Sequence, residues 1–334
     1  MVISRTPFRI SFFGGGTDFP QWYRQHGGLV ISTTINKYCY LNVRYLPPFF
    51  DYKYRIRYAN QEYVNHIDEI AHPSVRECIR FSGITEGLEV QHNADVPAMS
   101  GLGSSASFTA GLLNALRALQ GRIVGKRQLA AMAIDVDQHR IGECVGSQDQ
   151  VAAAFGGLNM IAFGPGDHFE VTPLTLAPEA VARLECHLML FFTGFQRIAS
   201  EIAAVQIQGL GQHQAEMMRI CSLAREAFAL LQQSPLDMAA LGGLLDEQWQ
   251  LKSRLSEQVS TPRIQEIYRA GVEAGAYGGK LLGAGGGGFI LFLAAPELHE
   301  QIRLALAPLL HVPVRFEQDG SRIIYYAPED PGLD

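Results

Sequence analysis

The chain has 334 residues, of which 47% are hydrophobic and 18% are charged. A chain of this length and composition buries a large core, which excludes disorder as its main state, and its length suggests two domains or one large domain. The formal net charge of −6 argues against a general nucleic-acid binder and against a binder of anionic membranes, because the binding surfaces of both classes are basic.

The first half of the chain is expected to open with strands, because several stretches are rich in β-branched and aromatic residues. These stretches are 8–13, 29–45, 52–58 and 88–95. A loop rich in glycine and serine follows, then a helix to about residue 120 and a second helix over about 127–141. The Gly-Pro-Gly turn at 164–166 predicts a boundary between two domains, 1–165 and 166–334.

The second half is expected to begin with a buried strand at 186–192, an apolar run too short to span a bilayer. Three long helical patterns follow, over about 199–233, 238–257 and 262–276. The remaining expected elements are a Gly-rich loop at 283–288, a strand at 289–293, a helix at about 296–308 and two short strands near 312–316 and 323–327. Helices and strands in both halves predict a mixed α+β fold.

The five cysteines are scattered and contain no C-x-x-C pair, so neither a disulfide framework nor a thiolate zinc site is indicated. A reducing, cytoplasmic compartment is the simple interpretation of this usage.

The segment Gly101-Leu-Gly-Ser-Ser-Ala106 stands directly before a predicted helix. No Asp or Glu occurs between Asp95 and Asp135, which leaves the positive end of that helix free to hold an anion. A capped helix after a turn is one interpretation. A dinucleotide-binding turn fits G-x-G-x-x-A but lacks the preceding buried strand and the later acidic residue. A nucleotide-triphosphate loop would have to differ from the Walker pattern, which is absent.

Three segments occur in a fixed order along the chain. They are Pro7-Phe-Arg-Ile-Ser-Phe-Phe-Gly-Gly-Gly-Thr-Asp18, Pro97-x3-Gly-Leu-Gly-Ser-Ser-Ala106 and Lys280-Leu-Leu-Gly-Ala-Gly-Gly-Gly-Gly-Phe289. Together they resemble the GHMP kinases, the small-molecule kinase superfamily named for galactokinase, homoserine kinase, mevalonate kinase and phosphomevalonate kinase. The resemblance covers almost the whole chain. It implies an N-terminal domain like ribosomal protein S5 and a ferredoxin-like C-terminal domain.

Further segments resemble the bacterial sugar 1-kinases of this superfamily. They are Phe-Phe-Gly-Gly-Gly-Thr-Asp18-Phe-Pro, Gly146-Ser-Gln-Asp149-Gln150 and Thr193-Gly-Phe-Gln-Arg197. The resemblance implies ATP-dependent phosphorylation of the anomeric C1 hydroxyl of D-glycero-D-manno-heptose 7-phosphate, for nucleotide-activated heptose used in surface polysaccharides. An L-fucose-type kinase is the alternative within the class. A catalytically silent sugar- and nucleotide-binding regulator is the alternative outside it.

The resemblance implies two catalytic residues. Asp149 is expected to be the base that accepts the proton of the attacking hydroxyl, and Arg9 takes the place of the basic residue beside it. The alternatives are a surface or helix-capping Asp149 and an Arg9 that faces water from a strand.

The resemblance also implies an ATP site with Mg²⁺. The residues expected to bind the ATP phosphates are Ser100, Gly101, Leu102, Gly103, Ser104, Ser105 and Ala106. A hydroxyl of Ser104 or Ser105 and the carboxylate of Asp137 are expected to hold Mg²⁺, although the family has the longer Glu at the position of Asp137. Glu143 is a competing ligand, and a solvated helix face is the alternative for Asp137.

The expected sugar site is built around Asp18, whose carboxylate can accept bonds from two hydroxyl groups. The other residues expected there are Gly14, Gly15, Gly16, Thr17 and Gly146. Arg197 is our hypothesis for the remote phosphate of a sugar-phosphate substrate, with a salt-bridged helix residue as the alternative. The expected partner is therefore this small molecule, without nucleic acid or membrane, and a homo-oligomer is compatible with the sequence. Lys280 has no assigned role.

Overall fold

A computed structural model describes residues 1–195, 199–256 and 258–327. The larger of its two sheets has nine strands and contains the path β13-β1-β2-β5-β3-β4, with β6 and β12 also paired to β2 and β7 paired to β6. Its strands are β1 (Val2–Phe13), β2 (Gly28–Tyr45), β3 (Tyr54–Arg57), β4 (Gln61–Val64), β5 (Leu88–Ala94), β6 (Leu158–Phe163), β7 (Phe169–Pro173), β12 (Phe316–Glu317) and β13 (Arg322–Tyr326).

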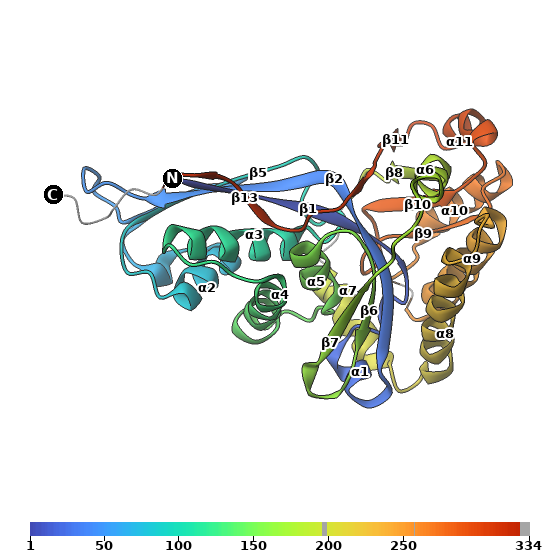
Figure 1. Cartoon of the computed structure of the whole chain (residues 1–334), viewed down its shortest axis with the longest axis horizontal. Helices are drawn as coiled ribbons and strands as arrows, with labels where there is room; N and C mark the ends of the chain where they lie inside the picture. The colour runs from blue at the N-terminus through green and yellow to red at the C-terminus, as the bar shows by residue number, and fades with distance from the viewer. Residues whose placement is uncertain (196–198, 257, 328–334) are drawn as a thin grey trace.

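Strand β2 is long enough to serve two parts of this sheet. Its residues 28–33 pair with β6 and its residues 39–45 pair with β5, while β1 pairs with it along most of its length. In Figure 1 the two blue strands run along the top of the molecule and then curve downward beside β6. The curve carries the end of β1 into the centre of the molecule, where Phe8 and Ile10 are buried.

Helices cover one face of the large sheet, on its lower side in Figure 1. They are α2 (Pro73–Ser82), α3 (Ser104–Leu119), α4 (Lys126–Ile134) and α5 (Gln148–Phe155). Helix α3 lies against β1 and β2, and its apolar residues are buried almost all round because α4 and α5 cover its other sides. The short α1 (Pro20–His26) follows β1, and Pro20 suits its first turn because proline needs no hydrogen-bond partner there.

The smaller sheet has four strands in the order β11-β8-β10-β9. Its strands are β8 (Leu188–Phe192), β9 (Gly278–Leu281), β10 (Phe289–Leu293) and β11 (Leu310–His311). The helices of this part are α6 (Pro178–His187), α7 (Ala199–Gly209), α8 (Gln214–Leu231), α9 (Met238–Arg254), α10 (Pro262–Glu273) and α11 (His299–Ala305). Strand β10 is buried at every residue, which accounts for the unbroken apolar run Phe-Ile-Leu-Phe-Leu.

The last described strands return to the first sheet. Strand β12 pairs with β2, and β13 pairs with β1 so that Val2 lies opposite Tyr326. Strand β7, which also lies beyond residue 165, pairs with β6. The division into 1–165 and 166–334 stays a prediction, and the chain crosses between the two sheets more than once.

Four expected elements differ in the structure. The strand expected near 312–316 is absent from the described residues, because β11 ends at His311 and β12 begins at Phe316. The helix expected over 127–141 is α4 followed by a π-helix, Asp135–Ile141, which ends at Gly142 in the left-handed conformation. The helix expected over 199–233 is two helices, α7 and α8, separated after Gly209. The strand expected from residue 186 begins at Leu188, because α6 continues through His187.

No helix within the described ranges is long and apolar enough to cross a membrane.

Candidate active site

A cavity of about 240 Å³ lies where the end of β1, the start of α3 and the start of α5 meet residues of α9 and β9. It is lined by residues from all three segments that the sequence analysis singled out. Nearly every expected site residue is either on its wall or directly behind it. The following paragraphs take these residues by role.

The loop before α3 has the form of an anion site. Gly101 and Gly103 both have positive φ, a conformation that glycine adopts without strain, and the first turn of α3 contains no acidic residue. The first N–H groups of a helix lack partners within it, so they are available to a negatively charged ligand. Gly101 also touches the second Gly-rich loop, because a Cβ on Gly283 would lie 2.6 Å from the Gly101 Cα.

The expected phosphate-loop residues divide into two groups. The residues on the cavity wall are Gly101, Gly103, Ser104, Ser105 and Ala106. The side chains of Ser100 and Leu102 are fully buried away from it, and Ser100 packs where Gly288 comes close. Ser100 and Leu102 therefore have only backbone groups to offer to a phosphate.

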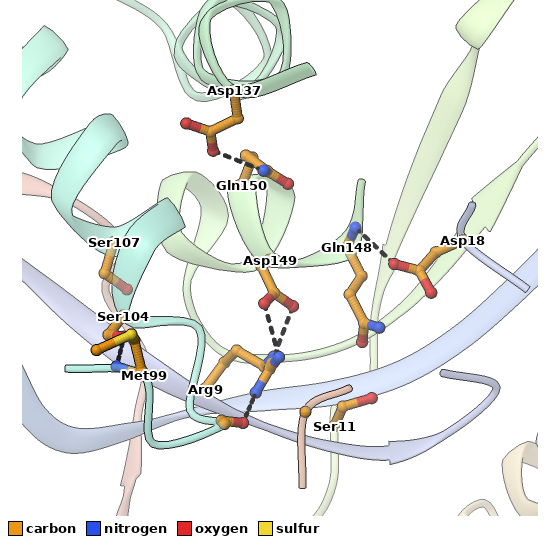
Figure 2. A network of polar contacts seen from close by, with 12 residues as sticks. Arg9, Ser11, Asp18, Met99, Ser104, Ser107, Asp137, Gln148, Asp149 and Gln150 are labelled. Atoms are coloured by element: carbon orange, nitrogen blue, oxygen red, sulfur yellow. Dashed lines mark hydrogen bonds and ion pairs between the residues drawn. The ribbon is translucent and has the colours of Figure 1, made fainter. Parts of the chain in front are cut away.

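Arg9 and Asp149 form the central ion pair (Figure 2). Arg9 donates from Nε to Asp149 Oδ1 and from Nη2 to Asp149 Oδ2, both at 2.7 Å, and it donates from Nη1 to the Gly101 carbonyl at 2.6 Å. The two parallel bonds fix the plane of the carboxylate. A Cβ on Gly103 would lie 3.4 Å from Asp149 Oδ2, so the carboxylate is directly beside the phosphate loop.

Asp18 lies on the other side of Asp149 from the phosphate loop. Its Oδ1 accepts from the Gly16 N–H at 2.8 Å and its Oδ2 accepts from the Gln148 N–H at 3.2 Å. Burial raises the pKa of Asp18, and the charge of Asp149 raises it further, while the two backbone bonds lower it. Gly146 allows this placement, because a Cβ there would overlap the Asp18 carboxylate.

Only some of the glycine-rich residues expected in the sugar site line the cavity. Gly15 and Gly16 line the cavity. Gly14 lies behind it, where a Cβ would overlap the Leu29 carbonyl. The Thr17 hydroxyl donates to the Gly14 carbonyl at 2.8 Å and is fully buried, so Thr17 holds the turn.

Asp137 reaches the cavity from the π-helix. Its two oxygens accept from Thr109 Oγ1 and Gln150 Nε2, each at 2.7 Å. Burial raises the pKa of Asp137 to about 7, with these two bonds opposing the shift. Glu143 lines the same cavity, and burial raises its pKa as well.

These residues fit a magnesium-nucleotide complex. Mg²⁺ prefers oxygen ligands and keeps few protein contacts beside phosphates, and the site offers hydroxyls of Ser104 and Ser105 and a carboxylate of Asp137. Within the described ranges no three His, Cys, Asp or Glu side chains gather into a metal site.

Several cavity residues were not found from the sequence. Ser11, Gln148 and Lys252 line the cavity, as does Lys280, which was left without a role. Gln148 stands beside Asp149 in a quoted segment and Ser11 stands within the first segment, so position alone gave a weak signal for both. Lys252 had none, because it lies on an ordinary helical pattern. Arg197 lies outside the described residues.

Two family models match the chain. The description "GHMP kinases N terminal domain" matches residues 65–157 and "GHMP kinases C terminal" matches residues 207–308, together more than half of the chain. The chain belongs to the GHMP kinases. The expected family is thereby confirmed, as is the expected two-domain α+β fold. Kinases of this family are ATP-dependent and in general use Mg²⁺.

Individual relatives agree with this family. The D-glycero-alpha-D-manno-heptose 7-phosphate kinase of Campylobacter jejuni is 27% identical over 88% of this chain and 90% of its own length. A D-glycero-D-manno-heptose 1-phosphate kinase from Bacteroides thetaiotaomicron has a crystal structure that superposes with a TM-score of 0.81, at 25% identity, over 98% of this chain and 100% of that one.

A third relative, the bifunctional fucokinase/GDP-fucose pyrophosphorylase of Arabidopsis thaliana, is 25% identical over 89% of this chain but only 30% of its own length. Family and relatives together support a sugar kinase, as expected from the sequence.

Proposed function

We propose that this GHMP kinase transfers the γ-phosphoryl group of ATP to the anomeric C1 hydroxyl of D-glycero-D-manno-heptose 7-phosphate, giving the 1,7-bisphosphate and ADP. The name of the Campylobacter jejuni relative supports this acceptor. The observation that carries the reaction type is the Asp149 carboxylate, held by Arg9 beside the glycine-rich loop. The product would supply nucleotide-activated heptose for a surface polysaccharide such as capsule, lipopolysaccharide or S-layer glycan.

In this proposal Asp149 accepts the proton of the C1 hydroxyl group. The oxygen of that hydroxyl group attacks the γ-phosphorus of ATP, and ADP leaves. Phosphoryl transfer depends on orientation and charge more than on covalent chemistry, so a fixed carboxylate suits the task. Arg9 orients Asp149 and adds positive charge beside the transferred group. Asp18 accepts hydrogen bonds from sugar hydroxyls with its remaining lone pairs.

The ATP phosphates would lie against the start of α3, where backbone N–H groups are available. Ser104 and Ser105 would supply hydroxyls and Asp137 a carboxylate to Mg²⁺. When bound, Mg²⁺ would neutralise part of the negative charge of the phosphate groups.

The remote phosphate of the substrate needs a cation that a free sugar does not. We assign this role to Arg197 on the sequence alone, because a guanidinium binds phosphate with a planar fork. The proposed partner is thus a sugar phosphate, with neither nucleic acid nor membrane, and a homo-oligomer is compatible with it. We place the activity in the cytoplasm, where ATP is available.

Coupled ADP release with Mg²⁺-ATP tests the proposal. The acceptors are D-glycero-D-manno-heptose 7-phosphate, sedoheptulose 7-phosphate, mannose, mannose 6-phosphate, L-fucose and galactose. We expect the heptose phosphate to turn over well above the free sugars, and Asp149→Ala to lower kcat by roughly 10²–10⁴-fold. Preference for a free sugar would reject D-glycero-D-manno-heptose 7-phosphate as the acceptor. An unchanged rate in the variant would reject Asp149 as the base.

A second candidate is an L-fucose 1-kinase, favoured by the fucokinase relative. It uses the same base and phosphate loop, but its acceptor has no phosphate. Turnover of L-fucose above heptose 7-phosphate in the same assay would select it. A silent sugar- and nucleotide-binding protein would release no ADP with any acceptor, and the intact Arg9–Asp149 pair argues against it.

A further inference from the structure

One corner of the cavity is built from polar side chains that the proposed reaction does not use. A Cβ placed on Gly15 would lie 3.5 Å from Ser11 Oγ, 3.6 Å from Gln148 Nε2 and 3.7 Å from Lys252 Nζ. Three polar groups from β1, α5 and α9 thus converge on the space in front of one glycine. In Figure 2 the side chains of Ser11 and Gln148 lie on the Asp18 side of the Arg9–Asp149 pair.

Two of these groups have unused hydrogen-bonding atoms. Ser11 is 4% exposed and Gln148 is 8% exposed, yet Ser11 Oγ and Gln148 Oε1 have no hydrogen-bond partner in the described part of the chain. A buried polar atom without a partner costs free energy, so such atoms are rare unless a ligand satisfies them.

Lys252 adds a cation to the same corner. Lys252 is 5% exposed, and its ammonium donates to the Gly283 carbonyl at 2.9 Å. An ammonium has three N–H donors, so further donors remain for a ligand. Lys280 differs, because it donates both to the Ser11 carbonyl at 2.8 Å and to the Phe12 carbonyl at 3.2 Å, and so holds backbone.

The mixture of donors and acceptors identifies the ligand chemistry. The hydroxyl of Ser11 and the amide of Gln148 both donate and accept, Lys252 donates, and Asp18 beside them accepts. A phosphate group offers acceptors alone and would be repelled by the Asp18 carboxylate. A sugar hydroxyl both donates and accepts, so adjacent hydroxyl groups match all four side chains.

We infer that Ser11, Gln148 and Lys252 form, with Asp18, the subsite for the hydroxyl groups next to the reacting hydroxyl of the acceptor. This inference rests on the proposed function in one respect, that the acceptor is a sugar. The remote phosphate of a sugar phosphate must then lie outside this corner.

Two substitutions test the subsite through the KM for the sugar, and the first of them also through the Tm. Ser11→Ala removes a buried hydroxyl without a partner, so the Tm should stay equal or rise, whereas the KM for the sugar should increase about fivefold to tenfold. Lys252→Met keeps the length of the side chain and should raise that KM about tenfold or more, since it removes a charged donor. The KM for ATP should change less than twofold in both.

Gly15→Ala supplies a steric test that does not depend on hydrogen bonding. Gly15 has no positive φ, and the new methyl group would make only ordinary contacts, so the fold is expected to persist. The methyl would occupy the space of a sugar hydroxyl and raise the sugar KM tenfold or more. Gly243→Ala on α9, where a Cβ has open space, is the matched control and should leave both KM values unchanged.

The variants are measured with whichever acceptor of the panel the wild-type protein prefers. The subsite proposal and the proposal of heptose 7-phosphate as acceptor can therefore be rejected independently of each other. Preference for a free sugar rejects the heptose 7-phosphate proposal but still allows the subsite to be scored. Sugar KM values within twofold of wild type in Ser11→Ala, Lys252→Met and Gly15→Ala overturn the subsite. A rise of the ATP KM equal to that of the sugar KM also overturns it.

Discussion

Arg9 shows how one side chain joins two parts of the proposed reaction centre. Its guanidinium fixes the Asp149 carboxylate with two bonds and holds the Gly101 carbonyl of the phosphate loop with a third. Only 5% of the side chain is exposed, so water does little to weaken these contacts. The geometry of the proposed base and that of the proposed phosphate loop therefore depend on the same planar group.

Arg9→Lys should separate charge from geometry. A lysine keeps the charge but cannot make the planar double contact, so we expect kcat to fall about tenfold or more while ATP binding changes less. Steady-state kinetics and nucleotide titration measure the two effects. Arg5→Lys on the same strand, which pairs with Glu317 outside the cavity, is the control and should behave as wild type. Equal kcat in both variants would contradict the role of Arg9.

Lys252 gives the site a pH dependence in a measurable range. Burial, assisted by the charge of Arg9, lowers the pKa of Lys252 from 10.5 to about 8, and the charges of Asp18 and Asp149 oppose this shift. Buried Lys280, whose own pKa is lowered by burial, also faces this group. The ammonium is therefore expected to lose its proton gradually as the pH rises through about 8.

We expect the sugar KM of the wild-type protein to rise as the pH increases from 7 to 9.5, because a donor cation is lost. In Lys252→Met the sugar KM should be flat over that range. The unfolded lysine keeps its proton to a higher pH, so this group should also make the free energy of unfolding increase between about pH 8 and 10.5. A parallel KM profile in the variant would exclude Lys252 as the titrating group.

At the scale of elements, the start of α3 is shaped by the left-handed backbone of Gly103. The φ of this residue is +76°, and a Cβ on it would lie 3.2 Å from Arg9 Cγ and 3.4 Å from Asp149 Oδ2. Glycine is required there both for the conformation and for the space.

Gly103→Ala should therefore weaken the phosphate site and strain the helix start. We expect the Kd for ATP to rise about tenfold and the free energy of unfolding to fall by about 1 kcal/mol or more. Titration with ATP and denaturant unfolding measure these effects. Gly125, which stands before α4 with negative φ and open space, provides the matched variant Gly125→Ala, expected to be neutral. Equal ATP affinity in the two variants would refute the phosphate-loop assignment.

At the scale of the whole molecule, α9 fastens the second half of the chain to the end of β1. Gln248 accepts from the Gly14 N–H at 2.6 Å and donates to the Phe12 carbonyl at 2.7 Å. Lys252 lies one turn further along the same helix, so α9 presents both side chains to β1. This contact lies next to the cavity, whose wall includes the neighbouring Gly15 and Lys252.

Gln248→Leu should loosen that attachment. It leaves the buried Gly14 N–H without its partner, which costs about 1–3 kcal/mol of unfolding free energy, and it should lower the kcat because Gly15 shifts. Gln250→Leu changes the same residue type at an exposed position of α9 and should be close to neutral. Urea unfolding with activity assays distinguishes them. Equal stability of the two variants would show that Gln248 does not fasten the halves.

Sequence reasoning located those parts of the site that depend on short local patterns. Asp18, Asp149 and the loop at 101–106 lie in compact segments, and the structure brings all three to one cavity. Lys252 could not be found that way, because no spacing connects a helix residue with Gly15, more than two hundred positions earlier. The strand expected at 29–45 is β2 to within one residue, since its β-branched pattern is continuous.

The helices were harder to delimit, because apolar periodicity continues across a short break. The interruption after Gly209 that separates α7 from α8 has only glycine as a signal, and the π-helix that positions Asp137 has the same composition as an ordinary helix. The sequence also could not predict which of the expected site residues line the cavity. Thr17 and Ser100 are buried behind its wall by close packing that only the fold creates.

The pairing of β13 with β1 has a consequence for how the protein is made. During synthesis β1 leaves the ribosome before its partner at one edge, residues 322–326, is made. Until then that edge carries unpaired N–H and C=O groups, the kind of surface that recruits other strands. Contacts so distant in sequence form slowly. That edge of β1 therefore stays unpaired while the residues between the two strands are synthesised, and β13 covers it only afterwards.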